Sequence, residues 1–277
     1  MTVFRPDNLS DALGFLSEAP AVVLAGGTDV FPSLGDRPAP PRVLDVTAVS
    51  DIRGIARDGD VWRIGAGVTW SELIRAELPA QFDALKVAGR QVGSVQIQNT
   101  GTIAGNICNA SPAADGVPVL LALDASVELA SAGGRRVVPL SEFVTGNRRT
   151  LRRPDEIVTA VHVPRMEGQV WSAFEKLGSR AYLVISIVSL AMVLRFDGRV
   201  VADARIAAGA CSEVPMRLAA LEGDLVGQEA AALGQVVRPE HFGGLKPIGD
   251  VRGTAAYRRV AVGTLAIRML DGCGTRL

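Results

Sequence analysis

Two glycine-rich segments, far apart in the chain, constrain its fold more than any other feature. Residues 24–29 are Leu-Ala-Gly-Gly-Thr-Asp and follow the apolar run 21–24, whereas residues 101–106 are Gly-Thr-Ile-Ala-Gly-Asn. Glycine accepts positive φ and lets the backbone come close to a ligand, so consecutive N–H groups can converge on an anion. A fold in which the two segments meet would therefore form one phosphate cradle from two distant parts of the chain.

Neither segment contains lysine or arginine, which limits how such a cradle would bind its ligand. A diphosphate would be held by backbone N–H groups and by the hydroxyls of Thr28 and Thr102. A second interpretation is that each segment is an ordinary turn after a strand, because Gly-Gly and Gly-Asn pairs mark turns in many folds. The two segments by themselves leave both interpretations open.

The better-known nucleotide motifs are missing from the sequence. No Gly-Lys-Ser or Gly-Lys-Thr is present, which excludes a P-loop. Residues 65–70, Gly-Ala-Gly-Val-Thr-Trp, begin like a dinucleotide-binding fingerprint but carry Trp70 where the third glycine belongs. Residues 69–72, Thr-Trp-Ser-Glu, predict a capping box at the start of a helix, so we interpret this stretch as structural.

Hydrophobic periodicity predicts alternating helices and strands first and a region of different character later, with a boundary near residues 164–169. Before the boundary we expect helices at 7–16, 71–75, 80–88 and 115–122, strands at 21–24, 42–46, 61–66 and 157–163, and a hairpin of 126–130 with 136–139. After it we expect an antiparallel meander of strands 171–176, 186–196 and 200–209, with an Asp197-Gly198 turn, and helices at 216–222, 228–236 and 255–270.

Six segments in a fixed order give the sequence a wider resemblance. They are residues 25–29, 64–69, 96–106, 110–115, 175–180 and 250–259. Together they resemble the FAD-binding subunit of the molybdenum hydroxylases, the family of xanthine dehydrogenase and aerobic carbon monoxide dehydrogenase. The resemblance implies an α+β fold: a PCMH-type FAD-binding domain at 1–167, with subdomains at about 1–55 and 56–167, then a smaller α+β domain at 168–277 with a three-stranded antiparallel sheet and helices.

The resemblance also implies which residues contact FAD. One side of the diphosphate would be wrapped by Val23, Leu24, Ala25, Gly26, Gly27, Thr28, Asp29 and Val30, and the other by Thr102, Ile103, Ala104, Gly105 and Asn106. Asp115 would lie near the ribityl or adenosine hydroxyls, the backbone of Val158 near the flavin or adenine, and Lys176 at the isoalloxazine edge, where a cation raises the flavin potential. The other interpretation of Lys176 is a surface lysine lying along the sheet. No catalytic residue and no metal ligand is implied.

Some positions depart from the family pattern. Ala104 stands where the family often has glycine, and Val92 stands where xanthine dehydrogenase has an aromatic residue on the flavin. Residues 179–184 lack the acidic cluster of the NAD-reducing xanthine enzymes. Tyr182 in that stretch is open to two interpretations, a shield over the flavin or a buried core residue.

The function implied by the family is electron relay. A large subunit with a molybdenum cofactor would oxidise the substrate, a small subunit would pass electrons through [2Fe-2S] clusters, and FAD in this chain would give them to NAD, oxygen or a quinone. Two alternatives remain: a stand-alone FAD-dependent oxidase or dehydrogenase acting on a small molecule, and a scaffold of the same fold without FAD.

Composition agrees with a globular subunit whose metal centres lie elsewhere. The chain has 277 residues, 48% of them hydrophobic, and 29 basic against 29 acidic residues, so no nucleic acid partner is expected. Cys108, Cys211 and Cys273 are too few and too far apart to hold an iron–sulfur cluster. No signal peptide or apolar stretch of membrane-spanning length is seen, so we expect a cytoplasmic protein without a membrane span.

Overall fold

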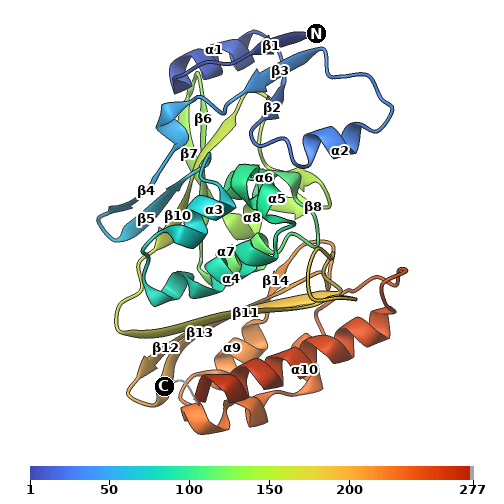
Figure 1. The fold of residues 1–277 in the computed structure, drawn as a ribbon. Helices are drawn as coiled ribbons and strands as arrows, with labels where there is room; N and C mark the ends of the chain where they lie inside the picture. The colour runs from blue at the N-terminus through green and yellow to red at the C-terminus, as the bar shows by residue number, and fades with distance from the viewer. Residues whose placement is uncertain (275–277) are drawn as a thin grey trace. The chain divides into compact units, whose positions relative to one another are not determined.

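The computed structural model describes residues 1–274 and divides the chain into two compact units (Figure 1). The first unit comprises residues 1–76, 94–110 and 125–164, and the second comprises residues 77–93, 111–124 and the chain from residue 165 onward. The units interleave in sequence: residues 77–93 and 111–124 lie within the first predicted domain but fold with the carboxyl-terminal part of the chain.

A small parallel sheet opens the first unit. Its strand order is β1-β3-β2, formed by Thr2–Phe4, Arg42–Asp45 and Val22–Leu24. Helix α1, Leu9–Glu18, begins where the Asn8 side chain accepts a hydrogen bond from the N–H of Asp11. Its buried residues Leu9, Ala12 and Leu16 are spaced three and four apart and so face the core on one side of the helix.

A five-stranded antiparallel sheet forms most of the remaining β-structure of the first unit. The order is β4-β5-β10-β6-β7, with β10, Ile157–Pro164, in the centre and almost wholly buried. The predicted hairpin is confirmed, because β6 and β7 pair from Ser126↔Pro139 to Ser131↔Gly134. The other strands of this sheet are β4 Ile55–Asp58, β5 Val61–Gly65, β6 Ser126–Ser131 and β7 Gly134–Pro139. A separate two-stranded sheet pairs β8 Val144–Gly146 with β9 Arg149–Thr150.

Short helices connect these strands. The predicted capping box is confirmed at the start of α3, where Thr69 and Glu72 bond each other's backbone N–H groups. The helices of this unit after α1 are α2 Val30–Leu34, η1 Ser50–Ile52, α3 Trp70–Arg75, α5 Val95–Thr100, α6 Ile103–Asn109 and α8 Leu140–Phe143.

The second unit is a sheet covered by helices on both faces. Strand β12, Val188–Asp197, is buried on both sides from Val188 to Leu194, consistent with its apolar run from Leu190 to Leu194. Helices α4 and α7 pack on the sheet, and α9 and α10 pack on it through a separate apolar core that includes Leu190, Met192 and Leu265. The elements are η2 Ala80–Phe82, α4 Asp83–Gln91, α7 Gly116–Ala122, β11 Gln169–Leu177, β13 Val200–Gly209, β14 Met216–Arg217, α9 Ala219–Leu225, η3 Ala230–Val236, η4 Pro239–Phe242 and α10 Ala255–Gly274.

The three predicted strands of this sheet are confirmed, and so is a helical segment near 228–236, but the helix predicted at 216–222 begins too early. Residues 216–217 form a fourth short strand beside β13, and the helix begins only at Ala219, because the guanidinium of Arg217 is tied to Asp124 and Glu222. Residues 230–236 form a 3₁₀ helix rather than an α-helix. Gly234 there touches α10 so closely that a Cβ would lie 2.0 Å from Asp271.

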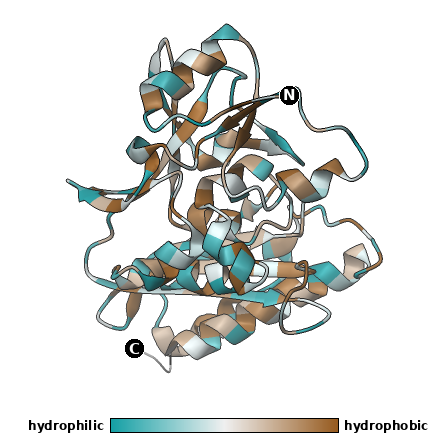
Figure 2. Ribbon diagram, turned by 45° about the horizontal axis from the view of Figure 1, so that its top comes forward, coloured by the Kyte–Doolittle hydropathy of each residue, from teal (hydrophilic) through white to brown (hydrophobic). Residues whose placement is uncertain are grey.

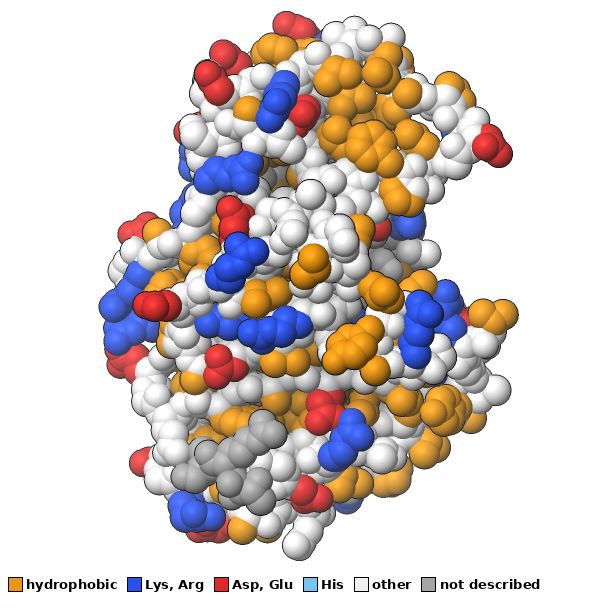
Figure 3. Space-filling view, viewed as in Figure 1, with side chains coloured by type: hydrophobic (Ala, Val, Ile, Leu, Met, Phe, Trp, Pro, Cys, Tyr) orange, Lys and Arg blue, Asp and Glu red, His pale blue; other side chains and the backbone are white. Residues whose placement is uncertain are grey.

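Polar and apolar residues are distributed so that apolar faces pack on the sheets and polar faces meet solvent. Figure 2 shows both colours along the long helix that ends near the C mark, consistent with α10 having one face on the sheet and one in solvent. On the face in Figure 3, side chains of both charges are interspersed. In the part of the chain that the structure describes, no helix has the length and apolarity needed to cross a membrane, and no group of three or more His, Cys, Asp or Glu is arranged for a metal ion.

Candidate cofactor site

The two glycine-rich segments meet in the first unit. A Cβ added to Gly26 would lie 1.9 Å from the carbonyl oxygen of Thr100, so only glycine allows this backbone contact. A Cβ on Gly101 would lie 3.5 Å from the Thr28 hydroxyl oxygen. The contact that the cradle hypothesis requires is therefore present.

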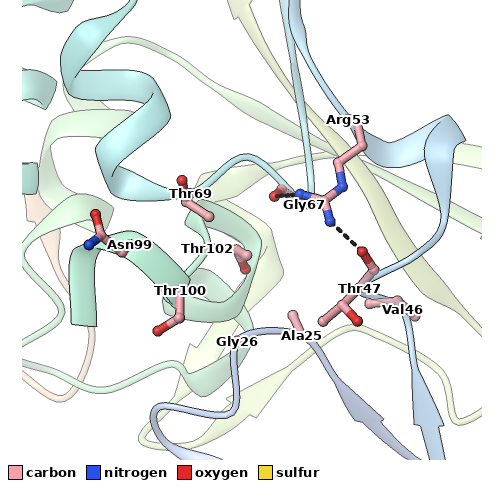
Figure 4. A pocket seen from close by; sticks show the side chains of 10 residues that line it. All are labelled: Ala25, Gly26, Val46, Thr47, Arg53, Gly67, Thr69, Asn99, Thr100 and Thr102. Atoms are coloured by element: carbon pink, nitrogen blue, oxygen red, sulfur yellow. Dashed lines mark hydrogen bonds between the residues drawn. The ribbon is translucent and has the colours of Figure 1, made fainter. Parts of the chain in front are cut away.

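A cavity of about 300 Å³ opens where the segments meet (Figure 4). Of the residues predicted to contact the cofactor, Ala25, Gly26 and Thr102 line it. The remaining lining residues come from elsewhere: Val46, Thr47, Arg53, Gly67, Thr69, Asn99 and Thr100. Gly67, Thr69, Asn99 and Thr100 fall inside segments that carry the resemblance, and that signal could have located them, but Val46, Thr47 and Arg53 carry no motif.

The first segment is a tight turn after β2. Gly27 has φ of +71°, a conformation that favours glycine, and its carbonyl accepts from the N–H of Phe31. Within residues 1–274, the N–H groups of Gly26, Gly27 and Thr28 donate to no protein acceptor. Three consecutive N–H groups are thus left for a ligand.

The second segment is helical rather than a loop, and part of it is already satisfied. Thr102 caps α6 by accepting a hydrogen bond from the N–H of Gly105 at 3.0 Å, and the N–H of Ile103 donates to the Val68 carbonyl. The side chains of Ile103 and Ala104 are buried. From this segment the Thr102 hydroxyl faces the cavity, while the helix behind it supplies packing.

Asn106 carries an unsatisfied atom on the same helix. Its side-chain oxygen Oδ1 is buried and has no hydrogen-bond partner among the described residues. Buried polar atoms are nearly always paired in native proteins, and an exception requires an explanation. A donor from a bound molecule would supply the missing partner.

Arg53 brings a positive charge to the cavity from a third segment. Its guanidinium Nη1 donates to the Gly67 carbonyl at 3.2 Å and its Nη2 donates to the Thr47 carbonyl. Figure 4 shows the guanidinium between these two backbone oxygens. The cavity lining therefore includes a cationic side chain that neither glycine-rich segment carries.

Asp115 and Lys176 lie together in the second unit. The Lys176 ammonium donates to Asp115 Oδ2 at 2.7 Å, to the Val184 carbonyl at 3.0 Å and to the Gln91 carbonyl at 3.4 Å, and Ser186 donates to Asp115 Oδ1 at 2.5 Å. The side chains of Lys176 and Asp115 are 6% and 7% exposed. Burial raises the pKa of Asp115, although Lys176 and Ser186 oppose the shift.

This cluster decides between interpretations left open by the sequence. Lys176 is not a surface lysine, since its three ammonium protons have three oxygen acceptors inside the protein. Tyr182 is 72% exposed, so it is not a core residue. Val158 is buried in β10 and paired with Leu129, and it does not line the cavity.

Two family models match the chain. Residues 1–166 match the FAD binding domain in molybdopterin dehydrogenase, and residues 172–272 match the CO dehydrogenase flavoprotein C-terminal domain.

Curated relatives and solved structures agree with the two models. The nicotinate dehydrogenase FAD-subunit of Eubacterium barkeri is 34% identical over 233 residues, which cover 81% of this chain and 79% of the relative. The carbon monoxide dehydrogenase medium chain of Hydrogenophaga pseudoflava is 29% identical, covering 98% of this chain and 96% of the relative. The structure of reconstituted CO dehydrogenase from Oligotropha carboxidovorans superposes with a TM-score of 0.92 at 26% identity, over 100% of this chain and 98% of that chain.

Proposed function

This chain belongs to the family of FAD-binding subunits of molybdopterin dehydrogenases, and we propose that it is the electron-transfer flavoprotein of a molybdenum-containing hydroxylase. Electrons would come from [2Fe-2S] clusters of a small subunit, after substrate oxidation at the molybdenum cofactor of a large subunit. They would pass to NAD, oxygen or a quinone. The chain itself is an oxidoreductase subunit with FAD as its cofactor.

The residues around the cavity fit the diphosphate of FAD. The N–H groups of Gly26, Gly27 and Thr28 have no protein acceptor within residues 1–274, and Gly26 and Thr102 line the cavity. The Gly26 contact with Thr100 supports the assignment most directly, because it joins the two segments in a way that any side chain on Gly26 would prevent. The unpaired Oδ1 of Asn106 fits a donor such as a flavin N–H or a ribityl hydroxyl.

FAD supplies the redox chemistry, accepting single electrons and releasing a pair, which no side chain of this chain can do. The chain's own residues bind and orient it. The amides of the first segment would fix the diphosphate, and Thr102, held by its bond from Gly105, would hold the second side. No acid, base or nucleophile is required of this chain.

Copurification and the visible spectrum together test the proposal. The chain is tagged and isolated from its native host under mild conditions. We expect flavin bands overlaid by iron–sulfur absorption, with one larger and one smaller subunit in constant ratio. A yellow chain without partners would contradict the relay and favour a stand-alone flavoenzyme. A colourless chain that added FAD cannot reconstitute would contradict the cofactor assignment itself.

A further inference from the structure

Arg53 lines the candidate cofactor cavity without having been assigned any function. It follows the 3₁₀ turn η1 and belongs neither to the two glycine-rich segments nor to the strands that carry them. Its position nevertheless depends on several specific features of the neighbouring backbone.

Two glycines make room for the segment that carries Arg53. A Cβ on Gly65 would lie 2.4 Å from the Ile52 carbonyl oxygen, and a Cβ on Gly67 would lie 3.3 Å from Cδ of Arg53. The N–H of Gly67 donates to the Ile52 carbonyl at 2.8 Å, and the N–H of Gly65 donates to the Gly54 carbonyl at 2.9 Å. The Gly-Ala-Gly stretch therefore holds residues 52–54 tightly in place.

The side chain of Arg53 is fixed as well. Its two bonds, to the carbonyls of Gly67 and Thr47, orient the planar guanidinium and leave its remaining N–H groups for another acceptor. Guanidinium groups bind phosphate with two parallel N–H bonds, which adds geometric specificity to the charge.

No acidic group neutralises this arginine among residues 1–274. The neighbouring acids are engaged elsewhere: Asp51 accepts from the N–H of Leu9, and Asp45 accepts from Thr47 and pairs with Arg5 at 3.6 Å. Both bonds of Arg53 go to uncharged carbonyl oxygens. Arg53 is an exposed arginine that lines the cavity, held by two backbone carbonyls and without an acidic partner among the described residues.

We propose that Arg53 is the positive partner of the diphosphate of the bound cofactor. The inference rests on the proposed function and adds a residue to it: the glycine segments supply amide donors, and Arg53 supplies the charge. The Gly65 and Gly67 pair, which the sequence suggested was merely structural, then serves the site by bringing Arg53 to it.

The test compares a ligand that has the diphosphate with one that lacks it. The full chain is stripped of cofactor, and binding of FAD and of riboflavin is measured by flavin fluorescence for the wild type, Arg53→Gln and Arg53→Lys. We expect Arg53→Gln to weaken FAD binding by about 10- to 100-fold, the range of one or two charge-assisted bonds, and to leave riboflavin binding unchanged. Arg53→Lys keeps the positive charge but loses the paired N–H donors of the guanidinium. Its affinity for FAD should lie between those of the wild type and Arg53→Gln.

Salt dependence gives a second readout that a purely structural role would not move. The wild-type affinity for FAD should fall with added potassium chloride more steeply than that of Arg53→Gln, because the variant has lost the charge that salt screens. Arg57→Gln is the matched control, since Arg57 bonds the Gly59 carbonyl and does not line the cavity. Thermal unfolding of each cofactor-free chain verifies the fold.

The outcomes separate this inference from the proposed function. Equal FAD affinities and equal salt slopes for the wild type and Arg53→Gln would overturn the role of Arg53 while leaving FAD binding intact. An equal loss for FAD and riboflavin, with unchanged salt slope, would also overturn it, since that pattern indicates a change of shape. A wild-type chain that binds no FAD would overturn the proposed function, and this inference with it.

Discussion

The cavity beside Gly26 and the cluster around Lys176 differ in whether their charged and polar groups have partners inside the protein. In the first unit, the guanidinium of Arg53 bonds only neutral carbonyls and consecutive N–H groups have no protein acceptor within residues 1–274. In the second unit, Lys176 has a carboxylate and two carbonyls, and Asp115 has a lysine and a serine. In the first region, hydrogen-bond donors remain without a protein acceptor. In the second, the donors of Lys176 and Ser186 all have acceptors inside the protein.

The difference indicates which of the predicted residues can bind a ligand directly. A buried ion pair whose partners are all inside the protein is costly to break, so it fixes structure. The cluster ties the end of β11 to the segment that follows it, through the Val184 carbonyl and Ser186, and to the start of α7 through Asp115. We infer that Lys176 and Asp115 stabilise the second unit, whereas the cavity residues are the ones available to contact the cofactor.

The largest effect is expected from breaking the closed cluster. Lys176→Met would leave the Asp115 carboxylate buried without its cation, which typically costs about 3–5 kcal/mol in the free energy of unfolding. Urea unfolding of the cofactor-free chain measures it. The matched control is Arg268→Ala, which removes the partner of the adjacent Glu175. That pair is 63% and 34% exposed and should contribute less than about 1 kcal/mol. Similar small losses for both variants would contradict the comparison.

The next effect concerns the backbone contact in the cavity. Gly26→Val would drive a side chain into the Thr100 carbonyl and separate the two segments, so FAD affinity should fall by about 100-fold or more, a difference of about 2.7 kcal/mol. Equilibrium titration with FAD measures this. Gly14→Ala is the control, because a Cβ there meets nothing within 4 Å. Unchanged FAD binding by Gly26→Val would show that the cradle lies elsewhere.

A smaller effect is expected at Asn106 in the first unit, whose side-chain oxygen Oδ1 is buried and has no hydrogen-bond partner among the described residues. Asn106→Ala should lower FAD affinity by about tenfold, the value of one buried hydrogen bond, while changing the unfolding free energy of the cofactor-free chain by less than about 1 kcal/mol. The chain loses no internal bond to Oδ1, which explains the second expectation. A large loss of stability without any change in FAD affinity would assign Asn106 to the core instead.

The smallest effect concerns Asp250, whose carboxylate, like that of Asp115, has its partners inside the protein. The N–H of Arg252 chiefly lowers the pKa of this carboxyl to about 2, with help from Arg258. The folded pKa lies below the unfolded value of about 3.9, so Asp250 stabilises the fold above about pH 4, and this contribution disappears between about pH 4 and pH 2. Urea midpoints of the wild type and Asp250→Asn should differ at pH 6 and converge near pH 2. A difference independent of pH would refute the linkage.

Much of the fold could be predicted because it depends on local pattern. The apolar run of β12, the Asp197-Gly198 turn and the capping box of Thr69 each carry their own signal. The misplaced helix at 216–222 depends on long-range bonds, since Arg217 reaches Asp124 across the sequence. Hydrophobic periodicity is a local pattern and does not indicate such a distant partner.

The candidate site, too, could be predicted only where a residue carries its own local signal. The glycines were visible because glycine is needed at a close backbone contact, as at Gly26. Arg53 was not visible, since nothing in its own neighbourhood marks an arginine as part of a site formed by three distant segments. The pairing of Lys176 with Asp115 was missed for the same reason: each residue was assigned alone, and their distance of 2.7 Å is a property of the folded chain.

The interleaving of the two units also sets an order of events during synthesis. Every residue of α7 is buried, and the helix packs on β12 and β13, which end at Gly209. Because translation proceeds from the amino terminus, α7 leaves the ribosome well before the strands that cover it. The nascent chain therefore exposes this apolar segment until residue 209 has emerged, and in that interval the segment can aggregate with other chains.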